Sequence, residues 1–309
     1  MLILFLLLSL SLHQKLTTNL AIIILGCIAL ALSYVSATSI NDIADARIDA
    51  INHPKSIGRP LITGEAKKSD LIILFSLASI GALIFALFIN WWALLIIGCS
   101  ILINVLYSLP PIRLSYRTFL APIILGVAYV GLPFMLGIVI SKSSLNLNNL
   151  LWILGLYIMF IGRIILKDFR DRKGDSKFHK PTFLLKYGKT ATCVFSYIAI
   201  IIGGSLLIAI TYKKIWLSII IALYIISIII MLRRLQLSPE GEQEQLSIGV
   251  GAKMGNGLLI TLLCAFALEQ SGVDSKTTIL ITSFLTLIFV ANYINFLINP
   301  KSATIGYKG

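Results

Sequence analysis

Residues 70–89 read DLIILFSLASIGALIFALFI, a run of 20 residues in which Asp70 is the one charged side chain. After Asn90, residues 91–108 read WWALLIIGCSILINVLYS and contain no charge. A helix needs about 20 mostly apolar residues to cross the hydrocarbon core of a bilayer. Two such runs in succession therefore predict a pair of membrane-spanning helices.

Apolar runs of similar length recur along the whole chain. They predict further helices at about 1–12, 18–42, 118–140, 150–167, 188–211, 214–233, 250–268 and 277–298. The runs are too long for the strands of a barrel, and a helix satisfies its own backbone polar groups inside a bilayer. We therefore expect an all-α, polytopic membrane helix bundle of nine or ten transmembrane helices, with residues 1–309 as a single domain.

The first apolar run, Met1 to Leu12, is short for a membrane span. It has no basic residues before it and no clear small-residue cleavage site after it, which favours a short or tilted helix over a cleaved signal. At the other end, the run 277–298 is expected to be an extra C-terminal helix.

The composition supports a membrane protein. The chain of 309 residues is 58% hydrophobic and only 13% charged, whereas a soluble domain carries about 25% charged residues. Its formal net charge is +13, but the charges lie between apolar runs. Membrane lipid headgroups and an anionic substrate are therefore the expected partners, rather than nucleic acid. The four cysteines lie inside apolar runs without a CxxC pair, so neither a disulfide framework nor cysteine chemistry is expected.

The charged residues are distributed unequally between the two sides of the predicted bundle. Of the 26 Lys and Arg residues, 21 fall on the side that holds the loops after the second, fourth, sixth and eighth helices. Of the 13 acidic residues, 11 fall on that same side. The positive-inside rule places this side in the cytoplasm of a cell-membrane protein. The tryptophans fall at predicted helix ends on the other side, as in an aromatic belt: Trp91, Trp92, Trp152 and Trp216.

Two acidic motifs share the pattern D-x2-D-x3-D-x3-H. The first reads NDIADARIDAINH over residues 41–53, and the second reads DFRDRKGDSKFH over residues 168–179. At about 100° per residue, positions i, i+3 and i+7 of a helix fall within roughly 60° of one another. Each motif therefore directs three carboxylates the same way, and such a group is tolerable if it holds a divalent cation. Oxygen ligands of this kind suit Mg²⁺, or Mn²⁺ as an alternative.

Basic residues accompany both motifs and the loop after residue 108. Arg and Lys side chains grip phosphate, Arg with two parallel hydrogen bonds and Lys as a point charge. The candidates for contact with an anionic substrate are Arg47, Arg59, Tyr107, Arg113, Lys167, Arg170, Arg172 and Lys177. Lys55 and Lys173 lie close by, and His53 and His179 are interpreted as loop residues rather than metal ligands. Two acid triplets on opposite sides of a hollow would hold a diphosphate through metal ions.

At these motifs the chain resembles the UbiA superfamily of intramembrane prenyltransferases. The segments that carry the resemblance are Asn41-Asp42-x2-Asp45-x3-Asp49, Gly58-Arg59-Pro60-Leu61-x2-Gly64, Tyr107-Ser-Leu-Pro-Pro-Ile-Arg113 and Lys167-Asp168-x2-Asp171-x3-Asp175. The resemblance implies a bundle around a central apolar cavity that opens sideways to lipid. It also implies that the motifs sit on the loops after the second and sixth helices, under short cytoplasmic helices.

The resemblance implies which residues bind metal. Asn41, Asp45 and Asp49 of the first motif and Asp171 and Asp175 of the second are the foremost candidates, and the four aspartates among them are the catalytic ones. Asp42 and Asp168 rank next. The implied reaction is magnesium-dependent transfer of an isoprenyl group from a prenyl diphosphate donor to a lipophilic, aromatic acceptor. The sequence leaves open which acceptor is used and how long the donor chain is.

Two alternatives remain. The first is a divalent-cation transporter, although such proteins place their ionisable groups near the bilayer midplane, and the acids here gather at helix ends. The second is phosphoribosyl transfer to a lipid phosphate, known in another branch of the superfamily. His53-Pro54 and Arg59-Pro60 resemble the first motif of that branch, which lacks the full second triplet found here.

Overall fold

The computed structural model describes residues 1–13, 15–16, 19–52, 54 and 58–299. Within these residues every regular element is a helix or a helical turn. The α-helices are α1 (Leu2–Leu12), α2 (Leu20–Asn52), α3 (Pro60–Thr63), α4 (Lys68–Leu87), α5 (Trp91–Ser108), α6 (Leu120–Gly126), α7 (Leu132–Ser141), α8 (Leu147–Ile164), α9 (Asp168–Lys177), α10 (Phe183–Ile210), α11 (Ile215–Leu237), α12 (Glu242–Gln270) and α13 (Ser275–Ile298). Three short turns join them: η1 (Leu114–Tyr116) and η3 (Ile165–Lys167) are 3-10, and η2 (Val127–Gly131) is π-helical.

The helices form the membrane bundle that the sequence predicts. In the described part of the chain, nine helical segments are long and apolar enough to cross a membrane, the last of them α13. The protein is therefore an integral, multi-pass membrane protein. Many large apolar side chains on the outer helices face outward, for example Leu280 at 71% and Phe284 at 64% exposed. These surfaces are suited to lipid contact.

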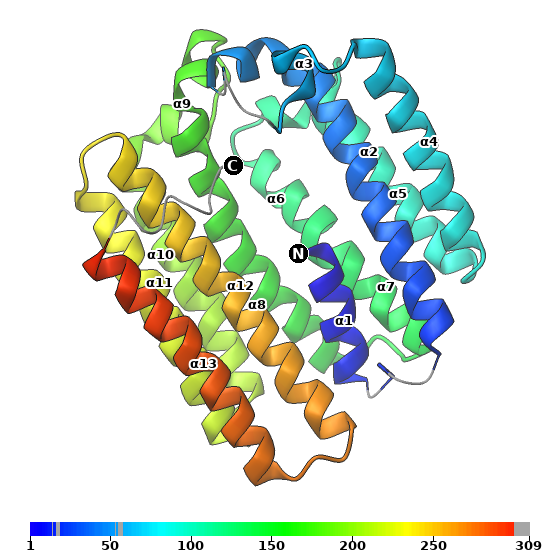
Figure 1. Cartoon of the computed structure of the whole chain (residues 1–309), viewed down its shortest axis with the longest axis vertical. Helices are drawn as coiled ribbons and strands as arrows, with labels where there is room; N and C mark the ends of the chain where they lie inside the picture. Colours follow the sequence, from blue (N-terminus) through cyan, green and yellow to red (C-terminus); the bar gives the residue numbers. More distant parts are fainter. Residues whose placement is uncertain (14, 17–18, 53, 55–57, 300–309) are drawn as a thin grey trace.

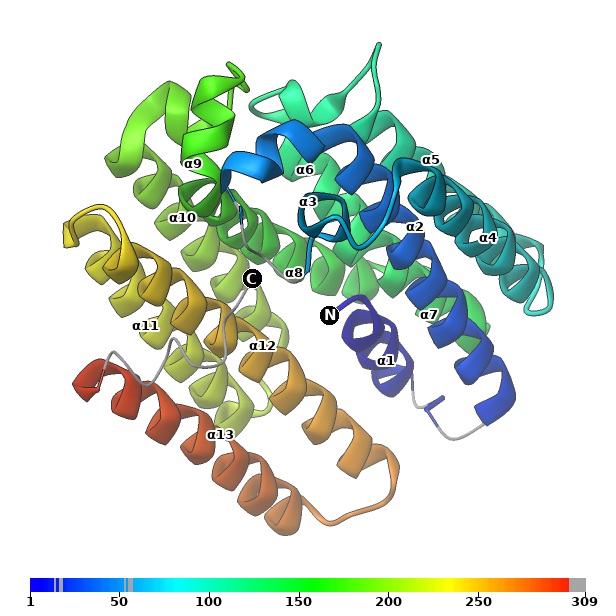
Figure 2. The same cartoon turned by 45° about the horizontal axis from the view of Figure 1, so that its top comes forward.

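Helix α1, at 11 residues, is shorter than these spans but packs inside the bundle. It lies against α7 and α12 (Figure 2). Leu6, Leu8 and Leu10 are fully buried there. Close approach to α7 depends on Gly137, because a Cβ at that position would lie 2.5 Å from Ser9 Cβ. The expected short first helix is thus an internal element of the fold.

Helices α2 and α8 carry the two motifs toward the same end of the bundle, where α3 and α9 also lie (Figure 1). α8 is held tightly against α10 by small residues. A Cβ on Gly155 would lie 3.2 Å from the carbonyl oxygen of Gly203, and the hydroxyl of Ser196 donates to the carbonyl of Gly162. Such close packing is typical of membrane helices and fixes the position of the second motif.

The tryptophans follow the expected belt only in part. Trp91 and Trp92 begin α5 and are 63% and 66% exposed. Trp152 is only 2% exposed and packs edge-on against Phe266, with ring centroids 5.6 Å apart. The belt prediction is therefore wrong for Trp152, because its ring fills the space between α8 and α12 and does not reach lipid.

Candidate active site

The first acidic triplet lies on the last three turns of α2. The sequence predicted that this helix ends near residue 42, but it continues to Asn52. The prediction was wrong because residues 41–52 contain neither glycine nor proline, so the helix persists beyond its apolar part. Asp45 and Asp49 are buried, at 7% and 6% exposed.

The second triplet lies on α9, which follows α8 through the 3-10 turn η3. Asp168 and Asp175 are 9% and 2% exposed, and Asp171 is partly exposed. The family resemblance implied that both motifs sit on loops. That expectation is wrong, since both are helical and therefore keep the i, i+3, i+7 spacing on one face.

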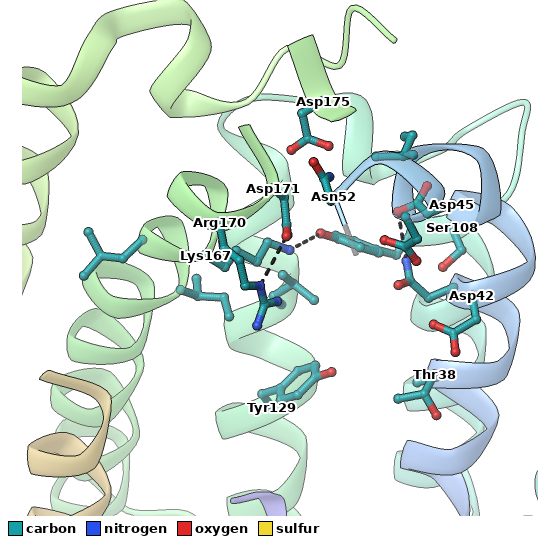
Figure 3. A pocket seen from close by; sticks show the side chains of 18 of the residues that line it. Thr38, Asp42, Asp45, Asn52, Ser108, Tyr129, Lys167, Arg170, Asp171 and Asp175 are labelled. Carbon is teal, nitrogen blue, oxygen red and sulfur yellow. Dashed lines mark hydrogen bonds and ion pairs between the residues drawn. The ribbon is translucent and has the colours of Figure 1, made fainter. Parts of the chain in front are cut away.

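Acidic residues of both triplets face one another across a cavity of about 390 Å³ (Figure 3). This volume falls within the range of small-molecule sites, about 300–1,000 Å³. The motif residues that line it are Asn41, Asp42, Asp45, Asp49, Asp171 and Asp175. Asp168 lines a separate small recess instead, together with Lys167 and Lys180. Five aspartates from two distant segments thus share one hollow.

The helices that carry the motifs also touch directly. The backbone N–H of Gly174 donates to Asn52 Oδ1 at 2.6 Å. A Cβ on Gly174 would lie 2.7 Å from the carbonyl oxygen of Ile48, so this close approach requires glycine. The contact fixes α9 against the end of α2 and sets the width of the cavity mouth.

Two arginines neutralise the first triplet. Arg59 precedes α3 and forms ion pairs with Asp42 and with Asp49, the latter with Nη1 3.1 Å from Oδ2. Arg113 follows α5 and places Nη2 3.3 Å from Asp45 Oδ1. Buried carboxylates need such partners because isolated buried charge is strongly unfavourable. Arg59 also lines the cavity, whereas Arg113 approaches Asp45 without lining it.

Lys180 links the two triplets. Its Nζ lies 3.4 Å from Asp45 Oδ2 and 3.6 Å from Asp175 Oδ1. Burial alone lowers the pKa of Lys180, but the carboxylates of Asp45 and Asp175 outweigh burial and raise this pKa above its ordinary value. The lysine is therefore a fixed positive charge between the two motifs.

Sequence reasoning missed Lys180 as a site residue. The residue lies five positions after Asp175 and was counted only among the basic residues of the cytoplasmic side. Its backbone N–H donates to the carbonyl of Asp175 at 2.9 Å in the turn that ends α9, and this turn directs the side chain back to the motif. The one signal in the sequence that could have identified Lys180 was its position only five residues after the second triplet.

Two further cations line the cavity beside the second triplet. Lys167 donates from Nζ to the hydroxyl of Tyr107 at 3.0 Å, and Arg170 donates from Nε to Asp171 Oδ1 at 3.2 Å. Tyr107 comes from α5, so the contact ties a third helix to the site. Among the predicted substrate contacts, the cavity therefore gathers Arg59, Tyr107, Lys167 and Arg170.

The other predicted contacts lie elsewhere. Arg47 and Lys177 are exposed and do not line the cavity. Arg172 is held by Glu240 and by Glu244, with its Nη2 3.3 Å from Glu244 Oε2. Arg47 and Lys177 leave their helices on the side opposite the acids, at about 100° per residue. Arg172 is closer to the acidic face of α9, but its guanidinium is held by the two glutamates. Lys173 and His179 are exposed, while His53 and Lys55 lie outside the described residues.

Below the motifs the cavity has an aromatic wall that the sequence did not indicate. The ring of Tyr129 stacks on Phe160 with centroids 5.8 Å apart and meets Tyr34 edge-on at 6.1 Å. Tyr129 belongs to the π-helical turn η2, a local geometry that is frequent at functional sites. The hollow thus changes from a charged mouth to an aromatic and apolar interior.

The carboxylates around the cavity suit a magnesium ion that substrate phosphate and water also coordinate, rather than a metal ion coordinated by protein side chains alone. Among the described residues no three His, Cys, Asp or Glu side chains lie close enough to complete a metal site. Asp175 Oδ1 is buried without a hydrogen bond, and its ion pair with Lys180 is long. Mg²⁺ usually takes one or two carboxylates and completes its shell with phosphate and water. Carboxylates on both sides of one cavity suit that mode of binding.

Comparison with known proteins identifies one family profile and several similar proteins. The sequence profile of the UbiA prenyltransferase family matches residues 2–254. A homogentisate phytyltransferase from Synechocystis sp. is 29% identical over 169 residues, which cover 52% of this chain and 54% of that protein. A digeranylgeranylglyceryl phosphate synthase from Methanocaldococcus jannaschii is 30% identical over 164 residues, with the same coverage of both chains. The chain thus spans about half the length of these curated relatives.

A solved structure shares the fold. The structure of a UbiA homolog from Archaeoglobus fulgidus bound to DMAPP and Mg²⁺ superposes with a TM-score of 0.57 and 17% identity, covering 94% of each chain. At this level of identity the likeness concerns the arrangement of the helices. Helix α13 lies beyond the residues that the family profile matches.

Proposed function

The chain belongs to the UbiA prenyltransferase family, and we propose that it transfers an isoprenyl group from a prenyl diphosphate to a lipophilic acceptor, with magnesium as cofactor. The observation that carries the proposal is the shared cavity: acids of two triplets and several cations surround its mouth, above an apolar interior. An anionic diphosphate headgroup with a long apolar tail needs this arrangement.

The roles at the mouth follow from position. Asp45 and Asp49 on one side, and Asp171 and Asp175 on the other, would hold the magnesium, with Asn41 and Asp42 beside them. When bound, magnesium neutralises the diphosphate and makes it a better leaving group; Mn²⁺ would serve in the same way. Arg59, Lys167 and Arg170 present N–H donors to phosphate oxygens from three segments of the chain.

The proposed reaction is a substitution at the first carbon of the donor. The C–O bond to the diphosphate breaks, its electron pair leaves with the diphosphate, and an allylic cation forms. The acceptor supplies the electron pair for the new bond and then loses a proton. Lys167 and Arg170 stabilise the charge that develops on the leaving group. The aromatic and apolar wall around Tyr129 excludes water, which would otherwise trap the cation.

The relatives support prenyl transfer while differing in acceptor. Their names point to homogentisate, an aromatic acid, in one case and to a glyceryl phosphate lipid in the other. An aromatic acceptor is our first choice for this chain, because the cavity wall is itself aromatic. The distribution of basic residues further supports a cavity mouth that faces the cytoplasm.

The experiment uses the full chain in lipid nanodiscs with radiolabelled geranylgeranyl diphosphate, a panel of acceptors and Mg²⁺. We expect labelled lipophilic product, its loss on chelation with EDTA, and partial recovery with Mn²⁺. Asp45→Ala or Asp171→Ala should lower turnover by at least about 100-fold, since each removes a charged group from the leaving-group site. Unchanged turnover in both variants would rule out the assigned role.

The alternatives are tested by the same preparation. Phosphoribosyl diphosphate in place of the prenyl donor should give no product, and the mass of any product identifies the group transferred. A metal-ion transporter would carry Mg²⁺ or Mn²⁺ into liposomes without any prenyl donor. In cells, mass spectrometry of lipophilic quinones and ether lipids with and without the gene would identify the acceptor.

A further inference from the structure

Two positively charged side chains lie on the last helices of the chain, away from the main cavity. Arg234 is in the last turn of α11, and Lys253 lies on α12. Both are partly buried, and neither lines the cavity. Within the described residues neither of them forms an ion pair. A charged residue in a membrane-spanning helix usually pairs with another group or serves a ligand.

The end of α13 brings aromatic residues to these two cations. Lys253 Nζ lies over the ring of Phe296, 4.4 Å from its centroid. Tyr293 precedes Phe296 by three positions, and Arg234 is close enough for its charge to act on the Tyr293 hydroxyl. Helix α13 lies on the outside of the bundle against α12 and α11 (Figure 1). Three helices thus contribute to one basic cluster, which consists of Arg234, Lys253, Tyr293 and Phe296.

The hydroxyl of Tyr293 is a buried polar group without a hydrogen bond. Tyr293 is 5% exposed, and its Oη has no hydrogen-bond partner within the described residues. Native proteins usually satisfy a buried hydroxyl with protein, water or a ligand, because leaving it unpaired is unfavourable. On the neighbouring helices, by contrast, Tyr224 Oη pairs with Thr261 Oγ1 at 2.8 Å. The basic cluster therefore offers two cations and a hydroxyl donor, and it lacks an anionic acceptor.

The acidic side chains of these three helices do not supply that acceptor. They are Glu242, Glu244 and Glu269, all on α12. Glu244 is held by Lys189. Glu269 is held by Lys214 at the opposite end of α12. Glu242 begins α12 eleven residues before Lys253, which is about 16 Å along the helix axis. An anion for the basic cluster therefore has to come from outside these helices.

The basic cluster lies at the depth where lipid headgroups are expected. The start of α12 contacts α9 through Glu244 and Arg172, so it lies at the end of the bundle that holds the acidic motifs. About 20 helical residues span the hydrocarbon core, and counted back from Glu269 they reach Val250. Lys253 is within one turn of this boundary, and a lysine side chain can extend from there to the headgroups.

From this arrangement we propose that Arg234, Lys253 and Tyr293 bind the phosphate of an anionic phospholipid in the leaflet beside the cavity mouth. Basic pockets between membrane helices bind lipid headgroups through the same kind of contact. Exposed apolar side chains on α11 and α13, such as Ile230 and Ile294, are suited to contact with the acyl chains. The site is separate from the main cavity, so this inference does not depend on the proposed prenyl transfer.

The charge of the cluster distinguishes between the possible sources of phosphate. A zwitterionic lipid offers the same phosphate but adds a cationic group, which Arg234 and Lys253 repel. Free inorganic phosphate has no acyl chains to contact the apolar residues beside the cluster. We therefore expect a preference for an anionic lipid over both.

Native mass spectrometry of the full chain in dodecyl maltoside measures the first binding event of phosphatidylglycerol and of phosphatidylcholine with the same acyl chains. The wild-type protein should bind phosphatidylglycerol at least about tenfold more tightly. Arg234→Gln and Lys253→Gln should each weaken this binding by about fivefold or more. Tyr293→Phe, which keeps the ring, should weaken it by about fivefold. The matched control is Arg233→Gln, at an exposed residue of α11 that donates to Gln236, and it should keep the affinity within about twofold.

Thermal midpoints in detergent without added phospholipid show which variants are folded. Equal affinity of the wild-type protein for the two lipids would overturn the inference. Wild-type affinity for phosphatidylglycerol in the folded variants of Arg234, Lys253 and Tyr293 would overturn it as well. Inorganic phosphate in large excess should not displace the bound lipid. Displacement by phosphate alone would show a general anion site and contradict the assignment to a phospholipid.

Discussion

Gly174 and Asn52 join the two acidic motifs: the backbone N–H of Gly174 on α9 donates to the side-chain oxygen of Asn52 on α2 at 2.6 Å. The two residues are 122 positions apart in the chain. The contact is close because Gly174 has no side chain to meet the carbonyl of Ile48. The distance between the triplets, and with it the fit to a diphosphate, therefore depends on this glycine.

Gly174→Ala should separate the two motif helices. The new Cβ would lie 2.7 Å from backbone oxygen and from the side chain of Asn52, and such overpacking costs about 1–3 kcal/mol. We expect a lower thermal midpoint and weaker donor binding. Gly131→Ala is the control, since a Cβ there meets nothing within 4 Å. Equal behaviour of the two variants would show that the glycine contact does not set the geometry of the site.

The membrane-spanning helices could be predicted from the sequence because each one is a long apolar run of sufficient length and hydropathy to cross a bilayer. The predicted spans 70–89 and 91–108 correspond to α4 and α5 within two residues. The end of α2 could not be placed in this way. There the helix leaves the apolar region but continues to Asn52 through polar residues, and its stability depends on packing against α9.

Lys180→Gln tests the lysine that links the triplets. Without its charge, Asp45 and Asp175 repel each other, so the metal-free variant should be destabilised by up to about 3 kcal/mol. Added Mg²⁺ should then raise the thermal midpoint of the variant more than that of the wild-type protein. Equal Mg²⁺ effects on both proteins would contradict the proximity of metal and lysine. Lys177→Gln, at an exposed position on α9, is the control.

The stability difference between the wild-type protein and Lys180→Gln should depend on pH in a way that follows from the raised pKa of Lys180. A group whose pKa is higher in the folded protein contributes stability below its unfolded pKa, about 10.4 for lysine, and loses it as pH rises through the folded value. The stability difference between wild type and Lys180→Gln should therefore stay constant from about pH 7 to pH 9. A difference that disappears within this window would contradict the assigned ion pairs.

Tyr107→Phe removes the hydroxyl that accepts the hydrogen bond from Lys167 at 3.0 Å and keeps the ring. A hydrogen bond to a charged group contributes about 1.5–3 kcal/mol, so turnover should fall by about tenfold or more as Lys167 loses its orientation. Donor affinity should change less. Tyr197→Phe is the matched control, because the hydroxyl of Tyr197 makes no hydrogen bond within the described residues. If the two variants have the same turnover, Lys167 does not depend on Tyr107.

Glu244→Gln tests the cluster that holds the outer face of α9. The carboxylate is 2% exposed and accepts from Lys189 Nζ at 2.6 Å and from Arg172 Nη2 at 3.3 Å. Removing one partner of a buried ion pair costs about 3–5 kcal/mol. Glu240→Gln, which also removes a partner of Arg172 but at a 78% exposed side chain, should cost under about 1 kcal/mol. Thermal unfolding in detergent that gives equal losses would contradict this distinction.

The candidate site was only partly accessible from sequence. Spacing alone identified the acids, because a helix converts i, i+3, i+7 into one face. It could not decide which basic residues face the cavity. Arg172 and Lys177 were expected at the substrate but lie elsewhere, while Lys180 was overlooked and contacts both triplets. These outcomes depend on the rotation of α9 about its axis, which the contact with α2 determines.

Binding of a labelled prenyl diphosphate to the purified full chain, with and without Mg²⁺, tests the central claim most directly. The claim is that both acid triplets hold one diphosphate. Asp45→Asn on α2 and Asp171→Asn on α9 should each abolish the Mg²⁺-dependent part of binding, whereas Asp70→Asn at the start of α4 should leave it intact. Full Mg²⁺-dependent binding after loss of either motif aspartate would contradict the claim.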